Sequence, residues 1–270
     1  GETPTLFHNN GDGTFSDWTA RSGIQRPSGA LSKALGVATP DINGDGWPDL
    51  FITCDTTDNL LYINQRNGRF REVGQEYGVA RTPDGRALAG MGVDVAAMPG
   101  ASDLAVVVTN FSNEGMSLKT RGQDGIFAHS GGPAGLTDAT MERVGFGVFF
   151  FDYDNDGLRD VFAANGHILQ HITARQENLS YEETPQLFRG LPGGRFEEVG
   201  ARLGGAFAVK TVARGAAWGD IDGDGRLDVL MVGNGRPLHL LHNQVPSRGH
   251  WLRIRLRGTK SNRDGIGARL

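Results

Sequence analysis

The sequence predicts an all-β fold arranged as a β-propeller, in which four-stranded sheets, or blades, stand around a centre. Two segments that recur along the 270 residues predict it. One is a nine-residue acidic loop with a short apolar run on each side, and the other has the apolar–glycine–apolar pattern of a β-hairpin. Two strands around the loop and two in the hairpin make a unit of roughly 40–60 residues, which is typical of a propeller blade.

The acidic loop occurs three times in one register. Its copies are Asp41-Ile-Asn-Gly-Asp-Gly-Trp-Pro-Asp49, Asp152-Tyr-Asp-Asn-Asp-Gly-Leu-Arg-Asp160 and Asp220-Ile-Asp-Gly-Asp-Gly-Arg-Leu-Asp228. Oxygen ligands at alternate positions, with glycine where the chain turns sharply, are what Ca²⁺ requires of a short loop. The alternative is a set of solvated turns without metal, because Asp, Asn and Gly are ordinary turn residues. Three copies in the same register favour the metal.

We expect side chains at loop positions 1, 3, 5 and 9, and the backbone carbonyl at position 7, to hold one Ca²⁺ per loop. The predicted ligands are Asp41, Asn43, Asp45, Trp47 and Asp49; Asp152, Asp154, Asp156, Leu158 and Asp160; and Asp220, Asp222, Asp224, Arg226 and Asp228. Without a cation, like charges at ~4 Å repel by about 1 kcal/mol in water and by more near a protein surface. The Asn at position 3 predicts that the first site is the weakest.

The flanks of the loops predict strands. An EF-hand needs Glu at position 12 and a helix on each side, but Ile52, Ala163 and Met231 occupy that position. Apolar runs bounded by turn residues are typical of buried strands. These runs cover residues 36–40, 147–151 and 215–219 before the loops, and 50–53, 161–164 and 229–232 after them.

A glycine five residues before each loop also recurs, at Gly36, Gly147 and Gly215. Gly92 has the same setting and precedes a shortened loop at 97–103 that retains only the closing acid, Asp103. We therefore predict a fourth, degenerate copy that binds no metal. The hairpin pattern recurs at 6–15, 61–70, 187–196 and, less regularly, 118–127, so the sequence predicts about four to five blades.

With these elements, the chain resembles the FG-GAP, or VCBS, repeat family, the calcium-loop propellers related to integrin α-subunit heads. Phe146-Gly147, just before the second loop, carries half of that name. The string Leu-x-Gly-Thr-x-Ser-Asn-Arg-Asp-Gly-Ile-Gly-Ala near the C-terminus is similar to the opening of the ASPIC/UnbV domain of proteins resembling cartilage acidic protein. The resemblance implies a partial propeller over 1–245 and the beginning of a β-rich ASPIC/UnbV domain over 246–270.

Members of that family resemble seven-bladed rings, so we interpret the chain as a C-terminal fragment. A partial ring leaves an open sheet flank, which the missing remainder of the chain or a neighbouring subunit would have to cover. An inserted segment around 167–184 enlarges the last interval between loops.

Charge and composition exclude several partners. The net charge is −4, and three bound Ca²⁺ would leave the chain near neutral, which argues against nucleic acid. We interpret the basic cluster of Arg253, Arg255, Arg257 and Lys260 as a solvated strand face. No stretch approaches the ~18 apolar residues of a membrane span. Cys54 is the single cysteine, so no internal disulfide can form.

Enzyme motifs are scarce in the sequence. A nucleophile elbow, a phosphate-binding loop and a His-Glu-x-x-His motif are all missing. His167 and His171 would share a face if the inserted segment were helical, and Glu177, Glu182 or Glu183 would have to complete a zinc site. A surface loop or short helix is the favoured interpretation there.

Two functions remain open. The favoured one is a non-enzymatic, calcium-binding adhesion, recognition or scaffold module for a protein or glycan; the alternative is a polysaccharide-processing enzyme or accessory subunit. Trp18, Trp47, Trp218 and Trp251 could line a sugar-binding surface, although Trp218 lies in a predicted buried strand. Weak calcium sites, with dissociation constants of about 10⁻⁴–10⁻³ M, fill outside cells. We therefore expect a secreted, periplasmic or cell-surface location.

Overall fold

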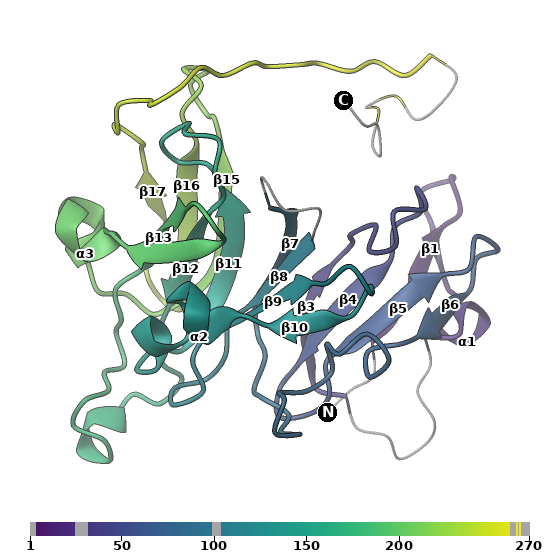
Figure 1. Ribbon diagram of the computed structural model, residues 1–270, viewed down its shortest axis with the longest axis horizontal. Helices are drawn as coiled ribbons and strands as arrows, with labels where there is room; N and C mark the ends of the chain where they lie inside the picture. Colours follow the sequence, from purple (N-terminus) through teal and green to yellow (C-terminus); the bar gives the residue numbers. More distant parts are fainter. Residues whose placement is uncertain (1–3, 25–31, 99–103, 260–262, 264, 266–270) are drawn as a thin grey trace.

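The computed structural model describes residues 4–24, 32–98, 104–259, 263 and 265, and its sheets are all antiparallel (Figure 1). Four sheets follow one another in chain order as the blades of a propeller arrangement, which confirms the predicted fold class. We number them blade 1 to blade 4. A two-stranded N-terminal hairpin precedes blade 1.

Within each blade, strands that are consecutive in the chain are neighbours in the sheet. Blade 1 comprises β3 (Ala34–Ala38), β4 (Leu50–Cys54), β5 (Leu60–Asn64) and β6 (Phe70–Glu72). Blade 2 comprises β7 (Val93–Ala97), β8 (Leu104–Val108), β9 (Ser117–Arg121) and β10 (Phe127–His129). Blade 3 comprises β11 (Gly145–Phe151), β12 (Asp160–Asn165), β13 (Gln186–Leu191) and β14 (Arg195–Glu198). Blade 4 comprises β15 (Ala213–Gly219), β16 (Asp228–Gly233) and β17 (His239–Leu241), and the hairpin comprises β1 (Phe7–Asn9) and β2 (Phe15–Asp17).

The helices of the described residues are single turns in the connections between strands. The α-helical turns α1, α2 and α3 follow β2, β10 and β14. Their bounds, with those of the 3-10 turns, are α1 (Thr19–Ser22), α2 (Gly131–Ala134), η1 (Asp138–Thr140), η2 (Ile172–Ala174), α3 (Gly200–Leu203) and η3 (Gly205–Ala208). Among the described helices, none has the length and apolar composition that crossing a membrane requires.

The predicted loops and hairpins are present, although blade 4 has the single strand β17 in place of a hairpin. The three acidic loops join the first two strands of blades 1, 3 and 4, and the predicted hairpins are β1–β2, β5–β6, β9–β10 and β13–β14. In blade 2, β7 and β8 flank the shortened loop. Residues 99–103 of that loop, with Asp103, lie outside the described residues.

The recurring glycine lets neighbouring blades approach closely. A Cβ added at Gly36 would lie 2.2 Å from the carbonyl oxygen of Met91, and one at Gly92 would lie 1.9 Å from the carbonyl oxygen of Phe146. Both distances are far below a van der Waals contact. At Gly215, in blade 4, the nearest atom is a methyl carbon at 3.4 Å, so no such constraint applies. The glycine is therefore required where a following blade packs against it.

Apolar side chains fill the junctions between blades. Phe51 and Val106 belong to one buried cluster that joins blades 1 and 2. Val107 and Phe150 join blades 2 and 3, and a cluster that includes Phe162 joins blades 3 and 4. Burial of such side chains contributes about 1.5–3 kcal/mol each, so the junctions hold the blades together.

Among the described residues, no sheet covers the face of blade 4 that points away from blade 3. Leu230, Val232 and Leu240 are 38%, 44% and 50% exposed. The matching positions of blade 3 include Phe162 and Leu187, which pair across β12–β13 as Leu230 and Leu240 pair across β16–β17. In blade 3 these side chains are buried against blade 4. The exposed apolar face is thus the surface on which a following sheet would pack.

The segment after β17 corrects one expectation. Residues 246–259 contain no strand or helix, so the strand predicted through Arg253, Arg255 and Arg257 is not formed. A strand needs a neighbour for its backbone hydrogen bonds, and Figure 1 shows this segment passing the loop end of blade 4 and then extending away from its sheet. Arg253 instead contacts Asp220. Lys260 lies outside the described residues.

Candidate metal centre

The three acidic loops share one backbone conformation. We call residues 41–49 loop 1, residues 152–160 loop 2 and residues 220–228 loop 3. The position-6 glycines, Gly46, Gly157 and Gly225, have φ angles of 86°, 85° and 83°. Side chains rarely adopt this left-handed conformation, so the predicted role of this glycine in the turn is confirmed.

The first acid of each loop organises the turn. Asp41 accepts hydrogen bonds from the backbone N–H groups of Asp45 and Gly46, each at 2.9 Å. Asp152 and Asp220 accept the same two bonds in loops 2 and 3. The repeated bonds draw position 1 toward positions 5 and 6, where further acidic oxygens gather.

The closing acid of each loop fastens the loop to the third strand. Asp49 accepts a bond from the Ile42 N–H at 2.9 Å through one oxygen, and from the Asn64 N–H at 2.8 Å through the other. Asp160 and Asp228 make the equivalent pairs of bonds. Burial raises the pKa of Asp160 to about 7 and also raises that of Asp49. This structural role of position 9 was not predicted from the sequence.

Acidic oxygens converge in loops 2 and 3. Oxygens of Asp152, Asp154 and Asp156 lie within 4.8 Å of one another, as do those of Asp220, Asp222 and Asp224. Such clusters could hold a metal ion. In loop 1 the amide of Asn43 donates a hydrogen bond to Asp45 at 3.1 Å, so this neutral side chain already satisfies one acid. The amide is consistent with the predicted weakness of the first site.

At position 7, the structure describes the backbone N–H groups. Those of Trp47, Leu158 and Arg226 donate to the position-5 carboxylate of their own loop at 2.8–2.9 Å. Trp47 is 46% exposed. Trp218 is 48% exposed, which corrects its predicted core position, because it lies where β15 leaves the blade junction for loop 3.

Loop 2 contains a buried carboxylate without a hydrogen-bond donor. Asp154 is fully buried, and neither of its oxygens accepts a hydrogen bond. The nearest charges are Arg248, at 2.9 Å, and Arg189, at 3.6 Å. Burial and the neighbouring Asp156 raise the pKa of Asp154, against the opposing effect of the two arginines. A buried charge without hydrogen bonds is costly, so this position is suited to a cation.

Basic side chains approach the acids of all three loops. The pairs are Arg66 with Asp45, Arg189 with Asp154 and Asp156, Arg248 with Asp154, Arg226 with Asp224, Arg253 with Asp220, and His242 with Asp222. These partners were not predicted from the sequence. A signal for His242 was present, because Leu240-Leu-His-Asn243 repeats the hairpin opening Leu6-Phe-His-Asn9.

The inserted segment does not form the zinc site considered above. His167 is fully buried and accepts a hydrogen bond from the Leu169 N–H at 3.0 Å, whereas His171 is exposed. The helical structure described nearby is the 3-10 turn η2, so the two rings do not share a helix face. Within the described part of the chain, the groups of three metal-ligating side chains lie in or beside loops 2 and 3.

Glu183, at the end of the inserted segment, should make stability depend on pH. It is fully buried, one oxygen accepts from the Val144 N–H at 3.0 Å, and the other has no partner. Burial raises its pKa from 4.5 to about 7. The folded protein therefore binds the Glu183 proton more tightly than the unfolded chain does. The free energy of unfolding consequently falls as pH rises from 4.5 to 7.

We expect Glu183→Gln to be roughly neutral at pH 4.5 and to stabilise the fold by about 1–3 kcal/mol at pH 8, because the amide carries no buried charge. Urea unfolding in chelator at both pH values measures the difference. Glu182→Gln is the control, since the Glu182 side chain is 41% exposed and is paired with Arg236. An equal pH response in Glu183→Gln and the parent would contradict the expectation.

Comparison with known proteins identifies the repeats. The profile of the FG-GAP-like repeat matches residues 1–52, 41–96 and 152–231, which together exceed half of the chain and include all three loops. No curated protein matches the chain significantly.

Among solved structures, the chain is similar to an Agrocybe aegerita lectin described in terms of specific recognition of non-reducing terminal N-acetylglucosamine. The identity is 18% and the TM-score 0.48, over 94% of this chain and 61% of the lectin chain. The chain thus spans about three fifths of that lectin's length. From the profile match, with the blade and loop geometry, we conclude that the chain is a β-propeller protein of the FG-GAP-like repeat family.

Proposed function

We propose that this protein is a non-enzymatic calcium-binding propeller that serves as an extracellular adhesion, recognition or scaffold module. The observation that carries the proposal is the fully buried, hydrogen-bond-free carboxylate of Asp154 beside Asp152 and Asp156. A hard cation with many oxygen ligands satisfies such a group. FG-GAP repeats commonly bind Ca²⁺, which adds support.

In loop 2, Asp152, Asp154 and Asp156 would hold the ion, with the Leu158 carbonyl and Asp160 completing the set. Bound Ca²⁺ supplies positive charge that offsets the repulsion among these acids. The protein's own contribution is to hold the loop shape, through the bonds of the first acid to the turn and of the closing acid to β13. The equivalent residues of loops 1 and 3 would each hold a cation in the same way.

The calcium proposal predicts a large change in thermal stability. Each independent site filled at 100 times its dissociation constant adds about 2.7 kcal/mol. We expect excess Ca²⁺ to raise the melting temperature by many degrees over excess chelator, and Mg²⁺ to raise it little, because Mg²⁺ demands stricter octahedral geometry. Differential scanning calorimetry of the full chain measures the shift. Equal melting temperatures in Ca²⁺ and chelator would refute the proposal.

We propose a protein or glycan as the ligand and no role for nucleic acid, consistent with the net charge of −4. Trp47 and Trp251 are half-exposed and offer aromatic contact surface of the kind both ligand classes use. The exposed face of blade 4 would be covered by a further sheet of this protein or of a neighbouring subunit. The resemblance at the C-terminus supports an ASPIC/UnbV-like region over 246–270.

A secreted, periplasmic or cell-surface location follows if the calcium sites are weak, because such sites fill where calcium is abundant. Glycan turnover would refute the non-enzymatic assignment if it were abolished by changing an acid outside loops 1 to 3. A binding module should instead lose ligand and stability together when calcium is removed.

A further inference from the structure

One position beside the metal loops differs in every blade that carries such a loop. In each of these blades, the backbone N–H of one residue at or after the third strand donates a hydrogen bond to the closing acid. The variable position is the residue that precedes this donor. Ile63 occupies it in blade 1, Arg189 in blade 3 and His242 in blade 4. Arg189 lies 3.6 Å from Asp154, the position-3 acid of loop 2, and His242 contacts the position-3 acid of loop 3, Asp222.

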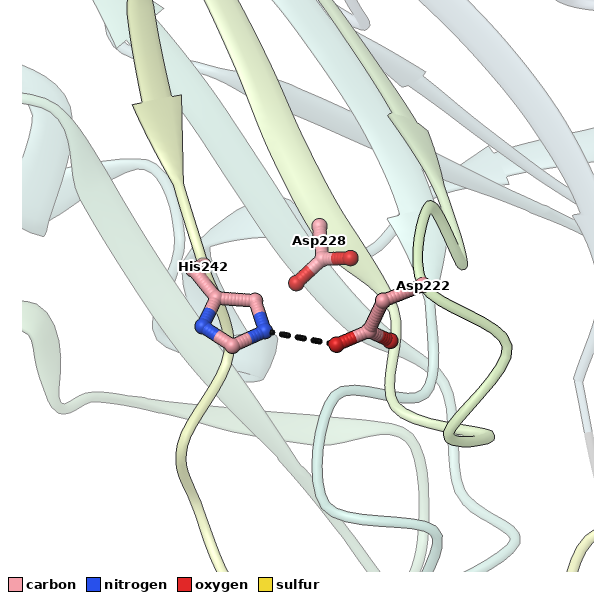
Figure 2. A group of neighbouring side chains, drawn as sticks. All are labelled: Asp222, Asp228 and His242. Carbon is pink, nitrogen blue, oxygen red and sulfur yellow. Dashed lines mark hydrogen bonds and ion pairs between the residues drawn. The ribbon is translucent and has the colours of Figure 1, made fainter.

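In blade 4, the histidine at this position forms a cluster with two carboxylates. Figure 2 shows His242, which follows β17, with its ring directed at the carboxylate of Asp222 and with Asp228 of β16 beside it. The Nε2 atom of His242 lies 3.0 Å from an oxygen of Asp222. One ligand atom from each of the three residues lies within 4.8 Å of the other two. Ligand atoms around a tetrahedral zinc ion lie ~3.3 Å apart, so small side-chain movements suffice.

The other charges of loop 3 direct a cation toward this cluster. Asp220 is paired with Arg253, and Asp224 is paired with Arg226. Asp222 has only the histidine as a basic partner among the described ion pairs, and the hydrogen bonds described for Asp228 come from backbone N–H groups. Asp222 and Asp228 are therefore the acids of loop 3 that form no ion pair with an arginine among the described pairs.

One proposed ligand is buried and held in place, and the other two are open to solvent. Asp228 is 2% exposed and is held by its two backbone bonds, so it offers a fixed oxygen. The side chains of Asp222 and His242 are 46% and 42% exposed, so an ion can enter from solvent. His242 also lines a cavity of about 580 Å³ between blades 3 and 4, whose apolar wall includes Phe151 and Leu203.

We propose that Asp222, Asp228 and His242 bind a transition-metal dication such as Zn²⁺, with water in the remaining position. Imidazole nitrogen is a preferred ligand of zinc, whereas Ca²⁺ takes oxygen ligands. Two carboxylates and one imidazole form a three-ligand set that leaves one position open. This inference rests on the proposed role of the loops in cation binding. It adds that loop 3 prefers a different metal from loop 2.

Zinc binding to the full chain at fixed pH tests the proposal, with calorimetry in excess Ca²⁺ as the readout. The test variant is His242→Ile, which installs the residue of blade 1, and the control is His239→Ala in β17, just before His242. We expect the parent and the control to bind one Zn²⁺ at least about tenfold more tightly than His242→Ile. Co²⁺ in place of zinc should show visible absorption bands that the test variant lacks.

Equal zinc affinity in the parent and His242→Ile would overturn the proposal. His242→Asn, which keeps a polar side chain, is the second variant if His242→Ile does not fold; unchanged zinc affinity there would overturn it too. If Ca²⁺ raised the melting temperature but zinc binding did not depend on His242, only the zinc inference would be refuted. If zinc binding depended on His242 but Ca²⁺ did not raise the melting temperature, only the calcium proposal would be refuted.

Discussion

Replacing Asp154 with asparagine should lower the stability of the protein when calcium is bound to loop 2 but not when calcium is absent. In chelator, we expect Asp154→Asn to unfold at the same or a higher temperature than the parent, because the change removes a fully buried charge without hydrogen bonds. In excess Ca²⁺, we expect the variant to lose the contribution of one site, about 2.7 kcal/mol at 100 times the dissociation constant.

The two conditions together make the result specific, because a variant that merely damages the fold would be less stable in both. Urea unfolding with Ca²⁺ and with chelator measures the pair of effects. Asp84→Asn is the matched control, since Asp84 is exposed and pairs with Arg86 outside the loops. Its exposed ion pair is worth about 0–1 kcal/mol in either condition. Retention of the full calcium gain by Asp154→Asn would contradict the assignment of Asp154 as a ligand.

Gly92→Ala should destabilise the junction between blades 2 and 3 by about 3 kcal/mol or more. Its methyl group would lie 1.9 Å from the Phe146 carbonyl oxygen and 2.9 Å from the Thr109 hydroxyl. The first of these atoms belongs to the backbone of β11 and cannot rotate away, so the blades must separate. Separation would loosen the apolar cluster that includes Phe150. Urea unfolding in excess Ca²⁺ measures the loss.

The repeat supplies the control for this variant. Gly215 holds the same place in blade 4, but an added Cβ meets nothing nearer than a methyl carbon at 3.4 Å. We expect Gly215→Ala to change the free energy of unfolding by less than about 1 kcal/mol, since ordinary contacts are tolerated. Comparable destabilisation in the two variants would show that the glycine serves each blade by itself and not the contact between blades.

The sequence by itself determined the class of fold and the units that build it. The loops 41–49, 152–160 and 220–228, the strands around them and the four hairpins could all be predicted, because alternating oxygens, glycine turns and short apolar runs are local patterns. Even the shortened copy before Leu104 was recognisable, since Gly92 and the β8 strand keep their places. Local conformation depends on residues that are close together in the chain. Because the loop and hairpin patterns recur, each copy strengthened the prediction made from the others.

Only the tertiary structure decided which charges meet. Arg248 approaches Asp154 across 94 positions of chain, and Arg253 approaches Asp220 from a segment predicted to be a strand. His242 joins Asp222 because β17 pairs with β16 and brings its end beside loop 3. The reason for the recurring glycine also needed the neighbouring blade, as the carbonyl of Phe146 beside Gly92 shows. Ion pairs and close backbone contacts depend on distances between blades, and the order of residues within one blade does not contain those distances.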